Sequence, residues 1–379
     1  MKRPQLSMLK SMKAIMAFAV LSLVMIACQK ENSLSTEMNE EQTLVRNAEQ
    51  IQQSSAADIQ TQGSSLGFST ADATVGARRA TQNIAEIAIG NPNFSALVAA
   101  VVKTGLVGAI SDPAASLTVF APTNTAFSRL PAPFNSATSI AAINDPAQID
   151  FLRSVLLYHV LGVEVFSNKI KNGQSSAATL KPAGASNDNT LYFSKTFNLI
   201  KINGQTEVIF PNLDATNGVV HVINDVLLFP TATIADVATS NPAFSALVAA
   251  LVKTDLVGVF TGKGDFTVFA PTDAAFAKLP APFNNAANIG AINNPAQIAA
   301  LSNILRYHVL GERTFGWDFG ILSKQETLAN EPKNDLRTII GLPVGFVKGN
   351  ANRNFSKVNA GDILCTNGVI HVIGDVLLP

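Results

Sequence analysis

Asn217–Leu228 reads NGVVHVINDVLL, and Asn367–Leu378 reads NGVIHVIGDVLL at an offset of 150 residues. Asn-Gly is a strong turn signal because both residues tolerate positive φ. The β-branched and apolar run that follows predicts a strand buried on both faces. Because this turn and strand occur twice, the chain is expected to contain two copies of one structural unit, each closed by this strand.

The composition describes an apolar chain with few charges. Of the 379 residues, 47% are hydrophobic and 14% are charged, whereas typical soluble domains carry about 25% charged residues. Lysine plus arginine equal aspartate plus glutamate at 27 each, so no basic field for nucleic acid is expected. The length suits two domains with a tail. The two cysteines, Cys28 and Cys365, do not indicate a disulfide framework.

The N-terminus has the pattern of a leader. Basic residues precede Ala14–Ala27, an apolar run of 14 residues that is short for a membrane span and typical of a signal-peptide core. The run ends in Met25-Ile26-Ala27-Cys28, which resembles a bacterial lipobox, although leucine is commoner than Met25. The resemblance implies cleavage of residues 1–27 and a lipid anchor on Cys28. An ordinary signal with an incidental cysteine, or an uncleaved anchor, is the alternative.

The next segment, residues 28–80, is rich in Gln, Ser, Thr, Asn and Glu and has no sustained period of 2 or 3.6. Such a composition cannot bury enough apolar surface to fold, so it predicts a flexible tether. About 50 flexible residues have an r.m.s. span of roughly 40 Å. The remaining chain divides into two repeated units, residues 81–229 and 230–379.

Helical patterns recur at matched positions of the two units. Asn91–Ala100 reads NPNFSALVAA and Asn241–Ala250 reads NPAFSALVAA. Apolar residues at i, i+3, i+4, i+7 and i+8, from Phe94 to Val102 in the first unit, with Asn as the cap and Pro at the first position, predict an amphipathic helix. Longer helices are predicted from Asp145-Pro146 and Asn294-Pro295, each ending in Tyr-His-Val-Leu-Gly with the glycine as terminator.

Strands are predicted between and after these helices. Leu117–Thr123 and its twin Phe266–Thr272 are short strands stopped by proline, each followed by a short helix. The second half of the first unit contains further apolar runs that predict strands at 190–193, 198–202 and 208–210. The matching part of the second unit, 316–354, is longer and glycine-rich, and predicts a mobile or partner-facing loop.

These motifs resemble the fasciclin (FAS1) domain over almost all of residues 81–379. The family's first signature is matched by Thr118–Phe127 and Thr267–Phe276. Its Tyr-His pair and its second signature are matched by Tyr158, His159, Tyr307 and His308, and by Asn217, Gly218, His221, Asn367, Gly368 and His371. The resemblance implies an α+β fold of two tandem FAS1 domains, each a wedge of β-strands packed with several helices. It also implies a secreted or cell-surface adhesion protein, with no cofactor expected.

The chain departs from the family pattern at two places. Asn224 and Gly374 follow His-Val-Ile where the family usually has Asp. Some animal members use an Asp-Ile pair before the Asn-Gly turn for integrin contact, and here Asp362-Ile363 matches it in the second unit alone. We make no prediction of integrin binding from one dipeptide. Asp362, Ile363 and Trp317, the single tryptophan, are nevertheless the candidate partner-binding residues.

All four histidines lie at matched places, His159 and His221 in one unit and His308 and His371 in the other. Two imidazoles of a unit and a carboxylate such as Asp225 or Asp375 would suit a metal site. The alternative is a buried neutral ring that bonds to the backbone. Apolar neighbours favour this structural role, and we expect no metal site.

The sequence offers no support for catalysis. Tyr158 and Tyr307 are interpreted as hydrogen-bonded core residues rather than proton relays, and Cys365 as an inert buried thiol. The sequence contains no nucleophile elbow, phosphate loop, Cys-x-x-Cys or His-x-x-x-His. We therefore expect a protein that is not an enzyme and has no catalytic residues.

Two functions remain open. The first is a protein lipid-anchored to the bacterial outer membrane, outside the cytoplasm, that binds a surface or matrix protein or a polysaccharide. The low charge, the tether and the family resemblance favour it. The second is a receptor or accessory protein for a small ligand or glycan, which would use a cleft between the units or the segment 316–354.

Overall fold

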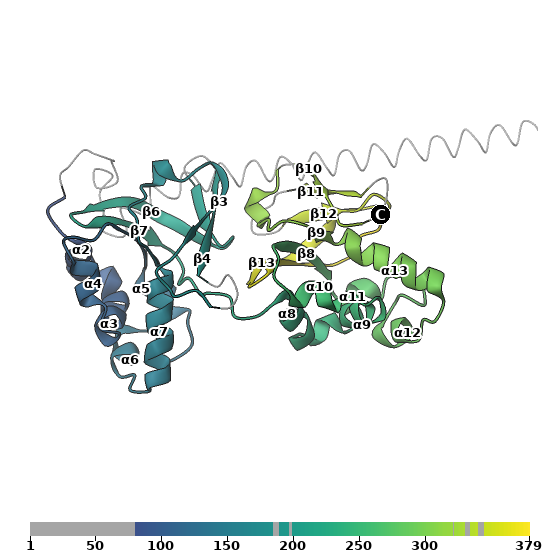
Figure 1. Cartoon of the computed structure of the whole chain (residues 1–379), viewed down its shortest axis with the longest axis horizontal. Coiled ribbons are helices and arrows are strands. Elements are labelled where there is room, and N and C mark those ends of the chain that lie inside the picture. The colour runs from purple at the N-terminus through teal and green to yellow at the C-terminus, as the bar shows by residue number, and fades with distance from the viewer. Residues whose placement is uncertain (1–79, 185–188, 197–198, 321, 330–333, 340–344) are drawn as a thin grey trace, which may run out of the picture.

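The computed structural model describes residues 80–184, 189–196, 199–320, 322–329, 334–339 and 345–379. The predicted leader, the predicted tether up to residue 79 and Cys28 lie outside the described residues. Figure 1 shows two similar bodies that follow one another along the chain. We call them domain 1, from α2 to β7, and domain 2, from α8 to β14.

Both domains have the same elements in the same order. Domain 1 contains α2 (Ile84–Gly90), η1 (Pro92–Phe94), α3 (Ser95–Lys103), α4 (Val107–Ser111), β1 (Leu117–Pro122), α5 (Asn124–Ser128), α6 (Ala137–Ala141), α7 (Pro146–Tyr158), β2 (Val160–Leu161), η2 (Ser167–Lys169), β3 (Gly173–Ala178), β4 (Thr190–Thr196), β5 (Leu199–Ile202), β6 (Thr206–Ala215) and β7 (Gly218–Ile223). Domain 2 contains α8 (Ile234–Ser240), η3 (Pro242–Phe244), α9 (Ser245–Lys253), α10 (Val257–Thr261), β8 (Phe266–Pro271), α11 (Asp273–Phe276), α12 (Ala286–Gly290), α13 (Pro295–Tyr307), β9 (Val309–Leu310), η4 (Gly316–Asp318), β10 (Ser323–Glu326), β11 (Asp335–Ile339), β12 (Phe346–Lys348), β13 (Ser356–Cys365) and β14 (Gly368–Ile373). The repeat seen in the sequence is therefore a repeat of the fold.

Each domain is built on one seven-stranded mixed sheet. The strand orders are β2-β1-β7-β6-β5-β4-β3 and β10-β11-β12-β13-β14-β8-β9. The repeated Asn-Gly strand, β7 or β14, lies inside its sheet and pairs in parallel with β1 or β8, whereas the other pairs are antiparallel. Every residue of β7 and β14 is buried, which confirms the strand predicted from the repeated stretch.

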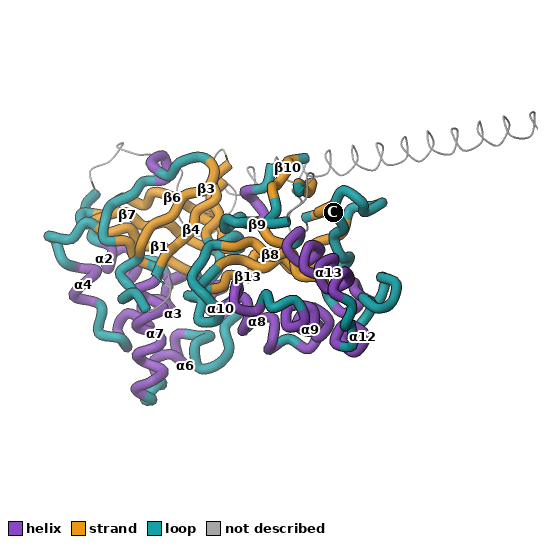
Figure 2. Tube along the Cα trace, turned by 45° about the vertical axis from the view of Figure 1, so that its right-hand side comes forward, coloured by secondary structure: helices purple, strands orange, loops and turns teal. Residues whose placement is uncertain are grey.

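The helices lie together on one side of each sheet, as Figure 2 shows for both domains. An apolar cluster joins the helices of domain 1 to β1 and β7, and a second cluster covers the part of the sheet near β4 and β5. Domain 2 has a matching pair of clusters. Phe94 and Phe127 in the first cluster are each 1% exposed, and burial of a side chain of this size contributes about 1.5–3 kcal/mol. This arrangement confirms the predicted α+β class.

The helix starts follow the predicted caps, with one difference in helix type. Asp145 caps α7 by accepting a hydrogen bond from the Ala147 N–H at 2.9 Å. Asn91 instead caps the short 3-10 helix η1, and α3 begins only at Ser95. The apolar stripe is also narrower than predicted, since Val102 is 62% exposed.

The predicted helix terminators are wrong. Helix α7 ends at Tyr158 with His159 as its C-cap, and β2 (Val160–Leu161) follows before Gly162. Domain 2 repeats this arrangement with α13 and β9. The helices end earlier than their sequence pattern suggests because the next two residues pair with the edge of β1 or β8.

The prediction of a loop at 316–354 is also wrong in part. The segment contains the 3-10 helix η4 and the strands β10, β11 and β12. These strands are short, and the residues of β10 alternate between half-buried and exposed, so they lack the apolar run that marks a buried strand. The predicted mobility of residues 321, 330–333 and 340–344 falls outside the described residues.

Candidate functional site

His159 joins the end of α7 to the chain that follows β7. The Leu227 N–H donates to His159 Nε2 at 2.9 Å, so the ring proton is on Nδ1 and donates to the Val155 carbonyl at 2.7 Å. His308 makes the same two bonds in domain 2, each at 2.8 Å. Burial lowers the pKa of His159 and His308 to about 4, so both rings are neutral at pH 7.

His221, in the centre of β7, makes the opposite choice of tautomer. The Asn212 N–H donates to His221 Nδ1 at 3.1 Å, so Nε2 carries the proton and donates to the Val165 carbonyl at 2.9 Å. The ring stacks on Phe120 with 5.5 Å between ring centroids. Burial lowers the pKa of His221 to about 4. His371 bonds in the same way in domain 2, at 3.3 Å and 3.0 Å.

These bonds leave little capacity for a metal ion. Both nitrogens of each ring already have a backbone partner, and a metal would have to displace the backbone N–H that uses the lone pair. The carboxylates considered as further ligands point elsewhere, because Asp225 pairs with Arg129 at 3.2 Å and Asp375 pairs with Lys278 at 2.6 Å. The described residues contain no group of three His, Cys, Asp or Glu side chains that could hold a metal ion.

The Asn217-Gly218 corner ties the first helix of domain 1 to its last strand. Asn217 Oδ1 accepts from the Ile84 N–H at 3.0 Å, and Asn217 Nδ2 donates to the Ile110 carbonyl at 2.9 Å. Gly218 has a φ of 146°, and a Cβ atom there would overlap the backbone of Leu117. Asn367 and Gly368 repeat these contacts in domain 2. Both residue types are therefore required by local geometry.

The tyrosines beside the helix-end histidines bond to the strands instead of to the imidazoles. The Tyr158 hydroxyl donates to the Thr190 carbonyl at 2.8 Å and accepts from Asn203 Nδ2 at 3.1 Å. The Tyr307 hydroxyl donates to the Asp335 carbonyl at 2.6 Å, and burial raises the pKa of this phenol. Each tyrosine therefore joins a helix to the outer strands of its sheet.

Cys365, at the end of β13, is fully buried. Burial raises the pKa of its thiol to about 12, even though Arg313 lies nearby. A thiol with such a pKa is protonated at neutral pH and is a poor nucleophile.

A second group of polar residues lies where the two domains meet, and we call it the interdomain seam. Figure 1 shows β3 and β4 of domain 1 beside domain 2. The seam comprises Gln174, Tyr192, Ser194, Lys201 and Gln205 from domain 1, with Arg313, Phe315, Trp317, Asp318, Gly361 and Asp362 from domain 2. The contacts come from β3, β4, β5 and the turn before β6 in domain 1, and from η4, the residues before it and β13 in domain 2.

Arg313 anchors the centre of the seam. Its side chain is 3% exposed and pairs with Asp265, with Nη2 at 2.9 Å from Oδ1. The guanidinium also donates to the carbonyls of Cys365 and Gly368, and it lies 4.6 Å from the centroid of the Tyr192 ring in domain 1. A buried guanidinium with this many acceptors and an aromatic face is held in one position. It provides domain 1 with a rigid contact.

Trp317 and Asp318 lie beside this anchor. Trp317 is 5% exposed, and Lys201 Nζ is 5.6 Å from the centroid of its ring. Asp318 Oδ2 accepts a hydrogen bond from Ser194 Oγ across the seam at 2.8 Å. Burial raises the pKa of the Asp318 carboxyl to about 6. The candidate tryptophan therefore lies between the domains in this structure.

Asp362 lies in a strained β-bulge, and domain 1 has an equivalent bulge at the matching place. It has a φ of 57°, and its counterpart Asn212 has a φ of 64°, both within register shifts of the penultimate strand. Asp362 Oδ1 accepts from the Gly316 N–H at 2.7 Å, just as Asn212 Oδ1 accepts from the Ser167 N–H at 2.8 Å. Burial raises the pKa of Asp362, and the nearby His371 opposes this effect.

The Asp362-Ile363 pair therefore faces inward at its first residue. Gln205 Nε2 of domain 1 also donates to the Gly361 and Asp362 carbonyls, at 3.0 Å and 3.4 Å. Ile363 is half-buried and packs against the apolar cluster of domain 2. A partner would reach the Asp362 carboxylate only after the seam had opened.

Sequence reasoning missed most of the seam, including Arg313, Asp318 and Tyr192. The available signal was a difference between the two copies. Arg313 and Asp318 stand where the first unit has Glu164 and Lys169. Residues that the two copies share lie mainly in the interior of each domain, whereas the contact between the domains depends on residues that the copies do not share.

Comparisons with known proteins agree with this architecture. Residues 92–229 and 242–379 match the family model described as "Fasciclin domain". Transforming growth factor-beta-induced protein ig-h3 of Sus scrofa is 27% identical over 269 residues, which cover 70% of this chain and 35% of that protein. Cell surface glycolipoprotein MPB83 of Mycobacterium bovis is 34% identical over 151 residues, which cover 38% of this chain and 60% of that protein. The chain thus spans about a third of the pig protein and three fifths of the mycobacterial one.

Among solved structures, the FAS1 domain pair from the insect cell adhesion molecule Fasciclin I is similar to 78% of this chain and 96% of that chain, at 19% identity and a TM-score of 0.35. Neither relative named above carries the name of an enzyme. The two ranges matched by the family model together cover more than half of the chain. The chain therefore belongs to the fasciclin domain family and contains two tandem copies of that domain.

Proposed function

We propose that this protein is a non-catalytic adhesion or partner-binding protein that is held at the bacterial outer membrane by a lipid on Cys28. The observation that carries the proposal is the match of residues 92–229 and 242–379 to the fasciclin domain family, since the sequence resemblance to that family implies a secreted or cell-surface adhesion protein. The name of the mycobacterial relative, a cell surface glycolipoprotein, supports the location. The partner would be a surface or matrix protein or a polysaccharide.

The chemistry of the described residues supports a passive role. The four imidazoles are occupied by backbone groups, and the Cys365 thiol is protonated at neutral pH. We propose that the matched Tyr, His and Asn-Gly residues are structural, because each joins two segments of its own domain. The electrostatically balanced chain, with 27 basic and 27 acidic residues, gives no support for nucleic acid as a partner.

The lipid anchor is tested by replacing its sulfur. A Cys28→Ser chain cannot form the thioether, so we expect it in the soluble fraction, whereas the natural chain should stay with the outer membrane after fractionation. Persistence of the Cys28→Ser chain in membranes would contradict the anchor.

Among the described residues no single helix is long and apolar enough to cross a membrane. Two bent pairs of helices meet that test only when the two helices of a pair are taken together, Ile84–Gly90 with Pro92–Lys103 and Ile234–Ser240 with Pro242–Lys253.

Adhesion is tested on intact cells. Cells that lack the protein should attach less well to a matrix surface or to neighbouring cells, and the natural chain should restore attachment. The Cys28→Ser chain is the matched control, because it carries the same two domains without the proposed anchor and should not restore attachment. Equal attachment by cells with and without the protein would contradict the adhesion proposal.

A second candidate function is binding of a glycan or small polar ligand between the domains. A hollow of about 420 Å³ lies there, lined from both domains by residues that include Gln174, Lys195, Glu312, Trp317 and Gln325. An aromatic ring with a few polar side chains directed at the same space can orient a bound ligand. This observation favours the alternative that the sequence left open.

Trp317 provides the readout that separates the two candidates. It is the single tryptophan of the chain and lines the hollow. A bound glycan should change its fluorescence, and Gln174→Ala should weaken that change, because Gln174 contributes a side chain from the facing domain. No fluorescence response to a panel of glycans would leave adhesion without a small ligand as the function.

A further inference from the structure

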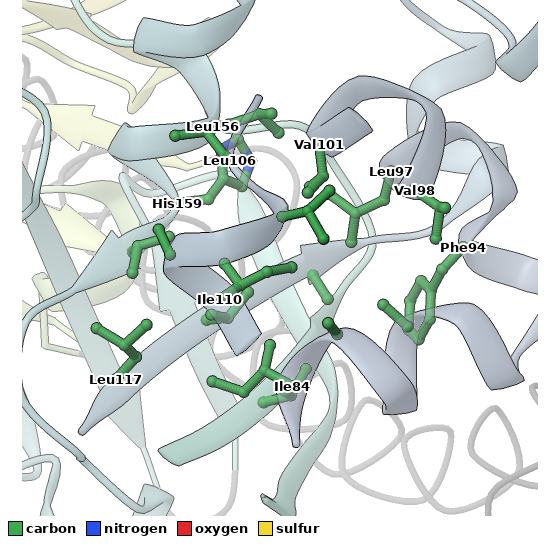
Figure 3. Close-up of a pocket in the computed structure, with 18 of the residues that line it drawn as sticks. Ile84, Phe94, Leu97, Val98, Val101, Leu106, Ile110, Leu117, Leu156 and His159 are labelled. Atoms are coloured by element: carbon green, nitrogen blue, oxygen red, sulfur yellow. The ribbon is translucent and has the colours of Figure 1, made fainter. Parts of the chain in front are cut away.

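Domain 1 contains an apolar pocket of about 170 Å³ that no function discussed so far uses. It lies between α2, α3, α4, α7 and β1, and Figure 3 shows aliphatic side chains pointing into it from all of these elements. Among the described residues that line it, His159 is the one polar side chain. Both nitrogens of that ring are bonded to backbone groups. The wall therefore offers a ligand no free hydrogen-bonding group.

The corresponding space in domain 2 is divided. Phe260 stands in place of Ile110, because its carbonyl accepts from Asn367 as that of Ile110 accepts from Asn217. Domain 2 has an inner space of about 20 Å³ and an outer one of about 160 Å³, and Phe260 lines both. Its ring is 6% exposed and packs edge-on against Phe266 at 5.9 Å.

Two further exchanges distinguish the pockets. Phe266 stands in place of Leu117, since these residues lie opposite Gly368 and Gly218 in the matched strand pairs. Arg306 takes the place of Leu157, just before the tyrosine that ends each long helix, and lines the outer space of domain 2. Two phenylalanines in contact with each other and one arginine thus stand in domain 2 at positions that are aliphatic in domain 1.

The rim of the domain 1 pocket is apolar as well. Ile89 is 67% exposed, Val102 is 62% exposed, Leu180 is 45% exposed and Val107 is 39% exposed, and all four line the pocket. Apolar side chains gathered around an opening mark a binding surface more often than scattered ones do. An apolar ligand would cover them, whereas a polar ligand would lose its hydrogen bonds to water without replacement.

We propose that domain 1 binds one aliphatic hydrocarbon chain, the acyl chain of a lipid, with its polar head group outside the pocket. Closed apolar cavities of about 150 Å³ in other proteins stay dry and bind small apolar molecules. This pocket is of that size but opens at an aliphatic rim, so a chain can enter while its head group stays in water. Figure 3 shows the labelled lining residues spread from Phe94 and Val98 to Leu156, which suits an extended ligand.

The position of the pocket in the chain favours a membrane lipid as the source. Its wall begins at Ile84 in α2, close to the first described residue, and 56 residues after Cys28. A chain of that length reaches at most about 200 Å when fully extended. If Cys28 carries the proposed anchor, membrane acyl chains lie within this reach. Binding of a free acyl chain does not depend on the anchor, so the two proposals can fail separately.

The test uses the full chain and cis-parinaric acid, a fatty acid that fluoresces when its chain enters an apolar site. We expect one site per chain and displacement of the probe by oleic acid but not by glucose. Ile110→Phe introduces the residue of domain 2 and should weaken binding by at least about tenfold. The matched variant Phe260→Ile should leave the first site intact and create a second one.

A further variant guards against misfolding. If Ile110→Phe lowers the melting temperature, Leu157→Arg repeats the test at a half-buried rim position and should also weaken binding. A parinaroyl phosphatidylcholine supplied in vesicles distinguishes the two sources of the acyl chain. Transfer of this lipid from the vesicles to the protein identifies a membrane lipid as the ligand. Binding of free parinaric acid without transfer of the phospholipid identifies a fatty acid. The proposal would be overturned if the natural chain did not bind the probe. It would also be overturned if the Ile110→Phe and Leu157→Arg chains both bound the probe as tightly as the natural chain does.

Discussion

In domain 1 the ring of His159 bonds to the backbone of Val155 and Leu227, and in domain 2 the ring of His308 makes the same two bonds within 0.1 Å of the same lengths. At the pocket, by contrast, Ile110 of domain 1 faces the space that Phe260 divides in domain 2. The difference follows from the energetics of burial. A buried polar bridge cannot change without leaving a partner unsatisfied, whereas a pocket wall or a seam can change while the core remains packed.

The largest effect is expected where both domains need glycine. Gly218→Ala would force a Cβ atom into the backbone of Leu117, and Gly368→Ala would do so against Phe266. Each should lower the free energy of unfolding of its own domain by more than about 4 kcal/mol. Gly108→Ala is the control, because a Cβ atom there meets no neighbour within 4 Å. Urea unfolding measures all three, and equal stabilities would refute the close packing of β1 and β7.

A smaller effect is expected from the helix-end histidines. His159→Leu fills the position with an apolar side chain and leaves the Val155 carbonyl and the Leu227 N–H without partners. The free energy of unfolding should fall by about 1–3 kcal/mol for each of these buried groups. His308→Leu should cost domain 2 a similar amount, since its two bonds are the same. Thermal unfolding of both variants compares them. A large loss in one domain and none in the other would show that the two bridges are not equivalent.

These histidines also predict how stability depends on pH. Folding lowers the pKa of His159, His221 and His308 from 6.5 to about 4. Between these two pH values the unfolded chain therefore binds more protons than the folded chain. Their contribution is present above pH 6.5 and is lost as the pH falls toward 4. Acid unfolding of the His159→Leu chain should therefore depend less on pH in this window than that of the natural chain.

The smallest effect is expected at the seam, and its sign is opposite. Burial at the seam raises the pKa of Asp318 from 3.8 to about 6, so we expect the docked state to hold the proton more tightly and docking to weaken as the pH rises from about 3.8 through 6. Each pKa unit corresponds to about 1.4 kcal/mol, so the docking free energy should change by roughly 1–3 kcal/mol. Asp318→Asn retains an acceptor for Ser194 without the charge and should remove this dependence.

Trp317 reports the state of the seam, because it is the single tryptophan and is buried there. Its emission should shift to the red between about pH 4 and pH 6 in the natural chain and stay constant in the Asp318→Asn chain. Asp375→Asn is the control, since this carboxylate pairs with Lys278 within domain 2. A red shift of the same size in both variants would contradict the role of Asp318.

The sequence predicts those parts of the fold that local patterns encode. The Asn-Gly turn and its apolar strand, the Asp145 cap and the strand at 117–122 are all present in the structure. The parallel pairing of β1 with β7 cannot be predicted from the sequence, because the residues of a strand do not specify which strand lies next to it in the sheet. The bulge at Asn212 was likewise unpredictable, since its φ of 64° reflects a tertiary bond to the Ser167 N–H.

The candidate site was less predictable than the fold. The histidines stood out because the two copies share them, but the partners of their rings are backbone groups that carry no sequence signal. Asp362 was noticed through a dipeptide, and its bond to the Gly316 N–H gives the dipeptide a role inside the domain. Trp317 was noticed through its rarity, which contains no information about the seam around it.

The position of β7 between β1 and β6 has a consequence for the order in which the domain can fold during synthesis. The last strand of each domain to be synthesised fills the middle of its sheet, and Asn217 must arrive before α2 has a partner for its first N–H. Contacts between such distant parts of a chain form slowly. A ribosome that still holds the final strand therefore carries a domain with an open sheet, and each domain can close only after its full length has emerged.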